Sequence, residues 1–547
     1  MQKRTLFCLL ISFIFCINIK AQSTSPLFSS PKHEVRAVWL TTIGGLDWPH
    51  HYAQSPHSAQ VQQQELRDLL DQYQRAGINT VIIQTRVRGT VIYPSQYEPY
   101  DGCLSGFPGK SPGYDALKFA IDECHKRGME VQAWVVTLPV GKWNKLGCAR
   151  LRQKFPRLIR KIDTDGYMNP EDPRTATYLA GICKEITQNY DIDGIHLDYI
   201  RYPETWKMKV SKDQGRNYIT HIVETIHDSV KTLKPWVKLS CSPIGKFNDL
   251  SRYWSHGWNA YDKVCQDAQG WLKAGLMDEL FPMMYFRNEQ FFPFAIDWAE
   301  QSHGKIVAPG LGVYFLDPKE GKWKLEDITR EMFLLRKYRL GHTYFRGKFF
   351  TDDIQGIYRF AQIFDAFPAL VPPMTWESKA LPDAPRGLQI FHDSLVWKGT
   401  TPYYNIYSSR TWPVDIHDAG NLVAARHTSA SIVVPTSGRY FAVTAMDRYG
   451  NESAPVQSHH QQESKAWEGL SCHDGWLSVP AKSNILDAHW LVIENLLGQQ
   501  MMTLPYKAGK AHVSKLAPGY YQLRTLSQKG ISHQLGYFKV ETSKEMP

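Results

Sequence analysis

The sequence predicts an α/β protein built as a closed (β/α)8 TIM barrel followed by two small all-β sandwich domains. Eight short apolar runs alternate with amphipathic helical segments between residues 33 and 370. This alternation is typical of a parallel sheet covered by helices, and eight such units close into a barrel. After Pro372 and Pro373 the helical segments stop, and short strands separated by turn residues follow. A chain of 547 residues is also too long for one core, so several domains are expected.

Each predicted barrel strand is a short apolar run that precedes a helical segment. The strands are predicted at residues 36–42, 79–86, 129–136, 193–200, 237–245, 280–286, 305–315 and 341–350. The helices are predicted at residues 58–75, 114–127, 173–189, 214–231, 260–274, 293–302, 325–336 and 354–363. Gly77 and Gly128 directly follow the first two helices, where glycine commonly ends a helix. Residues 42–47 lack the GxGxxG turn of an open dinucleotide-binding sheet, which favours the barrel.

Two β-rich segments follow the barrel. Residues 381–460 contain short strand-like runs between turn residues and resemble a fibronectin type III domain. A polar linker at residues 461–465 separates them from residues 466–543, which are again strand-rich. This last segment resembles the C-terminal sorting-type β-sandwich of secreted bacterial proteins, and a plain accessory sandwich is the alternative.

The first 21 residues predict export. Lys3 and Arg4 precede an apolar run at residues 6–17, and Ala21 is a small residue at the expected cleavage position. This pattern is typical of a secretory signal peptide, and no later run has the length of a transmembrane segment. The mature protein is therefore expected in the periplasm, at the cell surface or secreted. Its net charge, +10 with the leader, is mild and spread along the chain, so no nucleic-acid partner is expected.

The cysteines indicate neither a metal site nor a cofactor. Seven remain after the leader, none of them in a CxxC motif. They are interpreted mainly as buried thiols, and an oxidising compartment leaves room for one or two disulfides. No metal and no cofactor are expected.

The fourth predicted strand carries the sharpest functional signal. His196 and Asp198 are two residues apart and share one face of the strand. If Ile195 and Leu197 pack against the helices, that face is the barrel interior. Active sites of such barrels lie at the carboxyl ends of the strands, so Asp198 is the first predicted catalytic residue. The alternative is a structural pair capped by Arg201.

Glycosidic bond cleavage normally needs two carboxyl groups. Glu289 and Asp47, in loops that follow predicted strands, are the leading candidates for the second, and Glu204 is the next. Asp278 precedes a strand and is expected at the opposite end of the barrel. Residues predicted to bind substrate lie in or after the strands and are rich in aromatic and basic side chains, which suits a polyhydroxylated ligand. They are Trp39, Trp48, Arg86, Trp134, His196, Tyr199, Arg201, Tyr202, Tyr285, Arg287 and Tyr314.

Four segments resemble the glycosyl-hydrolase-like family 10 barrel proteins. They are residues 34–49, 79–86, 193–203 and 281–285, and the third of them is the most specific. The resemblance implies a (β/α)8 barrel that acts on bacterial envelope glycans or other polysaccharides, and some members are thought to cut peptidoglycan strands. One departure concerns Tyr199, because some relatives carry a second acid at that position.

The sequence therefore predicts an exported glycoside hydrolase that cleaves O-glycosidic bonds of an envelope glycan, such as peptidoglycan strands, or of another polysaccharide. Tyr199 and the two β-rich segments support an alternative, a glycan-binding surface protein built on a barrel without turnover. A metal-dependent deacetylase is disfavoured because no paired His/Asp ligand motif is present. The sugar, its linkage and the oligomeric state stay open.

Overall fold

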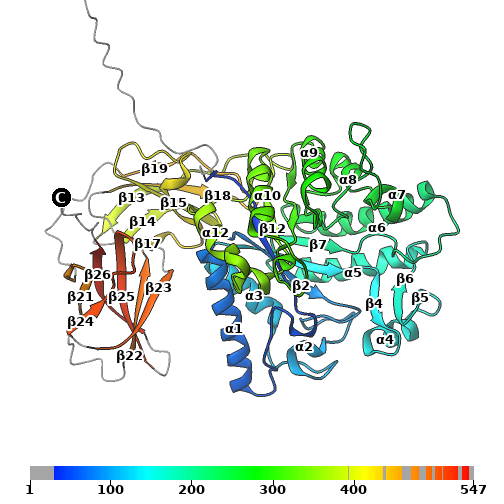
Figure 1. Ribbon diagram of the computed structural model, residues 1–547, viewed down its shortest axis with the longest axis horizontal. Coiled ribbons are helices and arrows are strands. Elements are labelled where there is room, and N and C mark those ends of the chain that lie inside the picture. The colour runs from blue at the N-terminus through cyan, green and yellow to red at the C-terminus, as the bar shows by residue number, and fades with distance from the viewer. Residues whose placement is uncertain are drawn as a thin grey trace, which may run out of the picture.

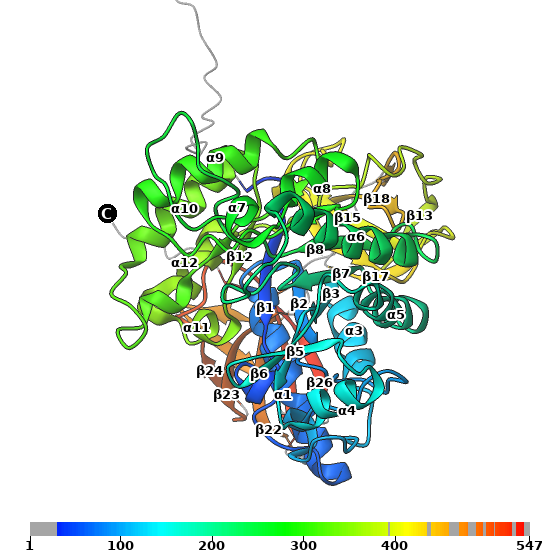
Figure 2. The ribbon, with the colours of Figure 1, turned by 90° about the vertical axis from the view of Figure 1, so that its right-hand side faces the viewer.

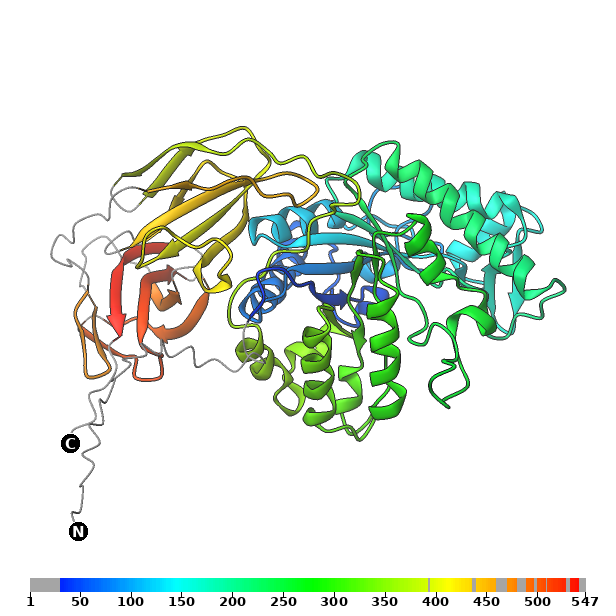
Figure 3. The same ribbon diagram turned by 90° about the horizontal axis from the view of Figure 1, so that it is seen from above.

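The structure, a computed structural model, has a barrel with β-rich domains at one of its ends (Figures 1 and 3). The predicted signal peptide, residues 1–21, lies outside the residues that the structure describes. The described residues are 30–391, 394–434, 439–458, 470–479, 488–495, 499–507, 509–527 and 532–540.

The barrel is an all-parallel sheet with strand order β10-β9-β8-β7-β3-β2-β1-β12-β11. Its strands are β1 (Arg36–Leu40), β2 (Thr80–Arg86), β3 (Glu130–Val136), β7 (Gly194–Asp198), β8 (Lys238–Cys241), β9 (Glu279–Leu280), β10 (Ile306–Val307), β11 (Gly310–Leu311) and β12 (His342–Tyr344). β10 and β11 are two halves of one pass of the chain. β10 pairs with β9 and β11 pairs with β12, so this pass joins the two ends of the sheet. The predicted α/β barrel fold is confirmed.

Helices follow the strands and cover the outside of the barrel. The longer ones are α1 (Pro56–Arg75), α3 (Ala116–Lys126), α5 (Pro173–Asn189), α6 (Lys212–Lys231), α8 (Ala268–Ala274), α9 (Phe292–Glu300), α10 (Leu325–Lys337) and α12 (Ile357–Phe364). Several begin at a Ser or Asp whose side chain accepts a hydrogen bond from a first-turn backbone N–H, which satisfies a donor that the helix leaves free. These N-caps include Ser55, Asp115, Asp172 and Ser211.

Two predicted strands end earlier than expected, and one predicted helix is divided in two. The strand predicted to residue 315 gives way to the 3-10 helix η3 (Val313–Leu316), and the strand predicted to residue 350 gives way to α11 (Gly347–Thr351). The helix predicted at residues 260–274 is divided into α7 (Ala260–Val264) and α8 because Cys265 adopts a left-handed φ of 57°. In the first two cases the side chains beyond the strand, such as Val313 and Phe350, are buried, so apolarity there indicates burial and not a strand.

A subdomain absent from the predicted elements lies between β3 and α5. It contains β4 (Pro139–Lys142), α4 (Leu146–Lys154), β5 (Ile159–Ile162) and β6 (Asp165–Met168). The strands form an antiparallel sheet in the order β4-β6-β5. Figures 1 and 3 show this subdomain at the end of the barrel opposite the β-rich domains.

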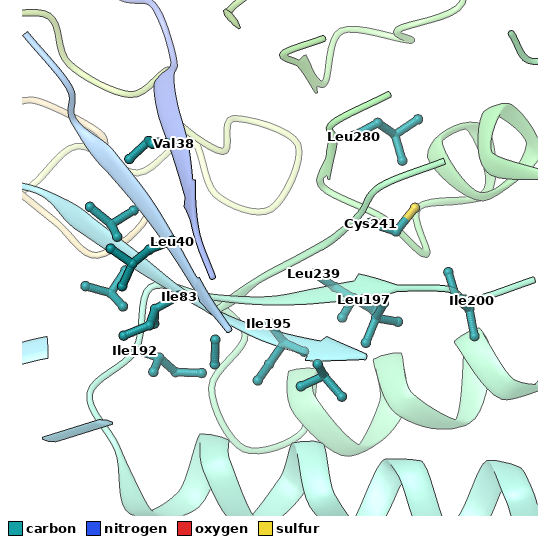
Figure 4. Close-up of a cluster of buried hydrophobic side chains, with 14 of the residues drawn as sticks. Val38, Leu40, Ile83, Ile192, Ile195, Leu197, Ile200, Leu239, Cys241 and Leu280 are labelled. Atoms are coloured by element: carbon teal, nitrogen blue, oxygen red, sulfur yellow. The ribbon is translucent and has the colours of Figure 1, made fainter. Parts of the chain in front are cut away.

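The main core lies between the barrel strands and the helices. Figure 4 shows Ile195 and Leu197 of β7 pointing toward the helices, among Leu40, Ile83 and Leu239 of neighbouring strands. Because side chains alternate along a strand, His196 and Asp198 take the opposite face. A second, separate cluster occupies that inner face and includes Trp39, Trp134 and Phe281.

The β-rich segments form antiparallel sheets of three and four strands. The first pair is β13-β14-β17 with β16-β15-β18-β19, and the second is β20-β21-β24 with β23-β22-β25-β26. These strands are β13 (Arg386–Phe391), β14 (Ser394–Lys398), β15 (Tyr403–Ser409), β16 (Leu422–His427), β17 (Ser431–Val433), β18 (Tyr440–Met446), β19 (Val456–Gln457), β20 (Cys472–His473), β21 (Trp476–Val479), β22 (Ala488–Asn495), β23 (Gln500–Pro505), β24 (Gly509–His512), β25 (Gly519–Ser527) and β26 (Ser532–Val540). Each pair encloses its own apolar cluster. The fibronectin type III and sorting-type assignments stay predictions.

Buried ion pairs join the first β-domain to the amino end of the barrel. Arg426 of β16 donates to Glu130 at 2.7 Å and also to Asp193, and both acids precede or begin barrel strands. Lys238 of β8 donates to Glu130 at 2.8 Å. Gly128 lies against the same β-strand, since a Cβ there would stand 2.4 Å from the carbonyl oxygen of Ala425. This domain therefore closes one end of the barrel.

The seven cysteines of the described residues are all free. Six are buried, which agrees with the predicted interpretation as core thiols. Burial also raises the pKa of the Cys124 and Cys183 thiols, which keeps them protonated.

Candidate active site

Asp198 ends β7 at the carboxyl end of the barrel. Its Oδ1 accepts hydrogen bonds from Ser242 Oγ at 2.9 Å and from the Tyr199 backbone N–H at 2.8 Å, and its Oδ2 accepts one from Trp134 Nε1 at 3.1 Å. The residue is 7% exposed. Burial raises the pKa of the Asp198 carboxyl group, although these donors and the nearby Arg201 partly oppose the rise. A carboxyl group that retains its proton is suited to general-acid catalysis.

His196 lies one layer deeper and has no exposed surface. Trp39 Nε1 donates to His196 Nε2 at 3.3 Å, and His196 Nδ1 lies 2.9 Å from Ser240 Oγ. Since Ser240 donates its own proton to Gln132 at 2.6 Å, the imidazole is neutral with its proton on Nδ1. Burial lowers the pKa of His196 to about 3. Trp39 and His196 thus form an internal layer beneath Asp198 and do not line a surface.

Asp47, a predicted candidate for the second carboxyl group, forms hydrogen bonds with two loops. Its Oδ2 accepts from the backbone N–H of Thr41 at 2.8 Å, and its Oδ1 accepts from Arg346 at 2.7 Å and from the backbone N–H of Lys348 at 2.9 Å. The carboxylate has no exposed surface. Asp47 therefore holds the loop after β1 against the loop after β12, and its oxygens are occupied by these donors.

Three further predicted substrate-binding residues are buried. Arg86 has no exposed surface and forms a two-pronged hydrogen bond with Glu98, at 2.7 Å from Nη2 and 3.0 Å from Nε. Trp48 donates from its indole N–H to the backbone oxygen of Gln62 at 2.9 Å. Tyr202 is 1% exposed and packs edge-on against Trp206. In the structure these side chains support the loops around the barrel mouth.

The segment that follows β7 carries a second carboxyl group, Glu204. Tyr199 is 39% exposed and adopts a left-handed φ of 54°. Arg201 stacks over its ring at 4.7 Å and forms a 2.7 Å ion pair with Glu204. Burial and the Asp198 charge raise the pKa of Tyr199, and the Glu204 charge adds to this effect, so both carboxyl groups act electrostatically on one phenol.

The environments of these two carboxyl groups are opposite. Burial raises the pKa of Glu204, but the hydrogen bond and charge of Arg201 outweigh burial, and the net pKa is lowered. The net pKa of Asp198 is raised instead. Carboxyl groups whose pKa values are driven apart are typical of an acid and base pair. Of the three predicted candidates, Glu204 is the one whose charge acts on Tyr199, the neighbour of Asp198.

Glu289, the other leading prediction, is exposed on the 3-10 helix η2 (Asn288–Gln290). No hydrogen bond or ion pair is recorded for its carboxylate within the described residues. The neighbouring Arg287 turns away to form a 3.2 Å ion pair with Asp327 of α10. The structure does not connect Glu289 with Asp198.

An aromatic group borders Asp198 on the side of β9 to β12. Tyr285 is half-buried. Burial raises the pKa of its phenol, and the negative charge of Asp198 adds to this rise. Its ring stacks on Phe345 at 5.2 Å and meets Tyr314 edge-on at 5.7 Å. The ring centroids of Tyr314 and Phe315 are 4.1 Å apart. Flat half-buried rings such as these can pack on sugar faces.

Sequence analysis missed Ser242 and Phe345 at this site. Ser242 directly follows β8 and donates to Asp198, and Phe345 directly follows β12. The rule that places functional groups at carboxyl strand ends applies to both positions. Applying it to every strand, and not only to ionisable and Trp or Tyr residues, would have included them.

Neither a metal cluster nor a membrane helix stands out in the part of the chain that the structure describes. No three His, Cys, Asp or Glu side chains are grouped there as metal ligands. No helix there combines the length and apolarity needed to cross a membrane.

Comparisons with known proteins match this barrel. The family model described as "Glycosyl hydrolase-like 10" matches residues 34–214 and 207–315. "Glycosyl hydrolase YngK" of Bacillus subtilis is 28% identical over 398 residues, which cover 66% of this chain and 77% of that protein. "Glycosyl hydrolase DigH" of Escherichia coli K12 is 30% identical over 302 residues, which cover 49% of this chain and 68% of that protein. The PgaB glycoside hydrolase domain from Bordetella bronchiseptica is 14% identical with a TM-score of 0.43, covering 61% of this chain and 99% of that chain.

The barrel and these relatives define the class of protein, which is a glycoside hydrolase. The chain belongs to the glycosyl hydrolase-like 10 family. The family resemblance of residues 34–49, 79–86, 193–203 and 281–285 is thereby confirmed, since all four segments lie within the matched region.

Proposed function

We propose that the protein is exported and hydrolyses O-glycosidic bonds of a bacterial envelope glycan, such as peptidoglycan strands. Asp198 acts as the general acid and protonates the oxygen of the leaving sugar. Glu204 either attacks the anomeric carbon, and water then releases the sugar, or takes a proton from the water that attacks this carbon directly. The observation that carries the proposal is a buried, raised-pKa carboxyl group at the carboxyl end of the fourth barrel strand.

The surrounding residues support these roles. Ser242 and Trp134 hold the Asp198 carboxyl group with one donor on each oxygen. Arg201 keeps Glu204 ionised by its 2.7 Å ion pair. Tyr285 provides a half-buried ring beside them. Asp47 and His196, by their burial, are proposed to position the site and not to contact the sugar.

Asp198→Asn is expected to reduce the release of reducing ends by about 10²–10⁴-fold, because a general acid contributes on that order. Purified mature protein is incubated with peptidoglycan strands and a panel of polysaccharides, and the products are identified by mass spectrometry. Asp228→Asn, an exposed change on α6, is the matched control and is expected to keep full activity.

Glu204→Gln and Glu289→Gln separate the two remaining carboxyl candidates. The proposal expects a large loss for Glu204→Gln and little change for Glu289→Gln. The reverse order would return Glu289 to the role predicted from sequence. Glycan binding without products from any substrate would favour the alternative, a binding protein that lacks turnover.

Export is tested separately. The tagged full-length chain is expressed and the cells are fractionated. The mature form is expected outside the inner membrane and without residues 1–21, as shown by intact mass. Retention of the full-length mass inside the cell would contradict this part of the proposal.

A further inference from the structure

The subdomain at residues 139–168, here called the basic subdomain, is attached directly beside Asp198. Thr137, which directly follows β3, donates to the backbone oxygen of Asp198 from its N–H at 2.9 Å and from its hydroxyl at 2.8 Å. β4 begins two residues later. Figures 1 and 3 show the basic subdomain at one end of the barrel, and Figure 2 faces this end. A ligand that extends from Asp198 toward this side meets the basic subdomain.

The basic subdomain concentrates positive charge. It contains eight Lys or Arg residues and two Asp residues, a net charge of +6 in 30 residues, while the whole chain carries +10. Lys142 pairs with Asp165 at 2.9 Å, and Arg160 lies 3.9 Å from Glu171. Five other cations are exposed and have no recorded ion pair within the described residues. They are Lys145, Arg150, Lys154, Arg157 and Lys161.

Aromatic rings lie among these cations. The Arg152 guanidinium stacks over Trp143 at 4.0 Å, and Arg160 lies over Trp206 at 5.2 Å. Lys154 lies 5.7 Å from the ring of Tyr97. Mixed cations and flat rings provide both a charge for an acid group and a surface for the apolar face of a sugar.

A hollow of about 340 Å³ lies between α4 and the loop after β2. Its volume falls within the range of small-molecule sites, about 300–1,000 Å³. The wall includes Arg150, Lys154, Gln153 and Tyr97. Glu98 also lines it, but Arg86 binds and neutralises this carboxylate. The hollow is therefore electropositive, is bordered by one ring, and has apolar wall groups from Pro99 and Leu151.

Positive charge also continues from this subdomain toward Asp198. Arg88, in the loop after β2, packs against Gly141 of β4, where a Cβ would lie 3.1 Å from the Arg88 Cβ. The Arg88 charge reaches the phenols of both Tyr199, beside Asp198, and Tyr167 of β6, and in each case opposes a rise in pKa led by burial. Arg88 thus bridges the reaction site and the basic subdomain.

We infer that the basic subdomain binds an anionic glycan, seating one acidic sugar in the hollow between Arg150 and Lys154 while the chain extends to Asp198. The anionic group is a carboxylate or a phosphate, since both suit Arg and Lys donors. The inference rests on the proposed function in that the bound chain is the one hydrolysed. It assigns the substrate class, a charged polysaccharide.

The test compares Arg150→Gln/Lys154→Gln/Lys161→Gln with a matched control, Lys184→Gln/Lys273→Gln/Lys337→Gln, which removes three exposed cations elsewhere. Both are made in the full chain with Asp198→Asn, so that binding is measured without turnover. The probes are polygalacturonate, its methyl ester, poly(glycerol phosphate), phosphatidylglycerol vesicles and single-stranded DNA. Affinities are measured by calorimetry or co-sedimentation at 50 and 200 mM NaCl.

The expected result is at least tenfold weaker binding of one or both anionic polymers by the first variant, with no change in the control. The methyl ester should bind wild type weakly, and added salt should weaken polygalacturonate binding. The two polymers distinguish a carboxylate from a phosphate ligand. Equal losses in both variants, or no loss in either, would overturn the inference. Vesicles or DNA bound as tightly as the polymers would do the same.

Failure of the proposed function gives a different pattern. Binding can follow the expected result while the wild-type protein releases no sugar from any bound polymer. That outcome would refute the proposed hydrolysis and support the proposed binding site. The Arg150 triple variant is also made with native Asp198. If this form hydrolyses neutral short oligosaccharides at wild-type rates, while anionic polymers bind the Asp198→Asn form normally, the proposed hydrolysis is supported and the proposed binding site is refuted.

Discussion

The Asp198 carboxyl group is held by neutral donors, and each of them tunes its acidity. Ser242→Ala removes the 2.9 Å donor to Oδ1. This hydrogen bond lowers the pKa of Asp198, so its loss is expected to raise that pKa by up to about one unit, given about 0.5–1.5 kcal/mol per hydrogen bond. The alkaline limb of kcat/KM, which reports the general acid of the free enzyme, should move to higher pH. If the alkaline limb of kcat/KM does not move, Asp198 is not the group whose titration produces it.

Glu279 predicts a pH dependence of stability. Burial raises the pKa of this β9 side chain to about 8, with Lys238 opposing the rise. Because the folded-state pKa lies above the unfolded value, the contribution is complete below about pH 4.5 and is lost as the pH rises to about 8. Glu279→Gln cannot ionise, so its Tm relative to wild type should be several °C higher at pH 8 than at pH 5. Parallel melting curves at both pH values would contradict this assignment.

Single residues were predictable from sequence where local alternation decided them. The pattern of residues 193–198 places His196 and Asp198 on one face, and the structure has Ile195 and Leu197 on the other. Asp47 shows the limit. Its partners Arg346 and Lys348 lie about 300 residues further along the chain, so its burial could not be predicted without the fold.

At the scale of elements, Gly128 shows how a helix end meets a distant strand. It follows α3 with a φ of +72°, and a Cβ there would lie 2.4 Å from the Ala425 oxygen of β16. Gly128→Ala is therefore expected to lower the free energy of unfolding by more than the left-handed φ alone would. Gly304→Ala, with φ +75° and nothing within 4 Å of its Cβ, supplies that reference, about 1 kcal/mol. Denaturant unfolding compares the two, and equal losses would exclude the clash.

The barrel strands and long helices were predicted with their order because burial and amphipathicity repeat along the chain. The antiparallel β4, β5 and β6 were not, because they are four residues long and β5 carries Arg160 and Lys161 on exposed positions. Their charge was also interpreted as part of an even distribution. Eight Lys or Arg residues are instead gathered in the subdomain that follows Thr137, whose hydroxyl donates to the backbone oxygen of Asp198.

For the whole molecule, Arg426 couples the first β-domain to the barrel. Arg426→Met leaves Glu130 and Asp193 buried without their common partner, which is expected to destabilise by about 3–5 kcal/mol. Arg448→Met breaks a pair with Asp191 that is substantially exposed, so about 0–1 kcal/mol is expected. Denaturant unfolding followed by intrinsic fluorescence measures both. Similar small losses would mean that the β-domain is only loosely associated with the barrel.

The filled interior of the barrel affects how Asp198 exchanges its proton with solvent. The space beneath Asp198 is occupied by Trp39, Trp134, His196 and Phe281. The first β-domain closes the opposite end of the barrel. The small exposed part of the Asp198 side chain therefore meets bulk solvent at the mouth of the barrel. A polymer lying across that mouth would seal the acid from solvent, so the proton stays in place until it is given to the departing sugar, and reloading awaits product departure.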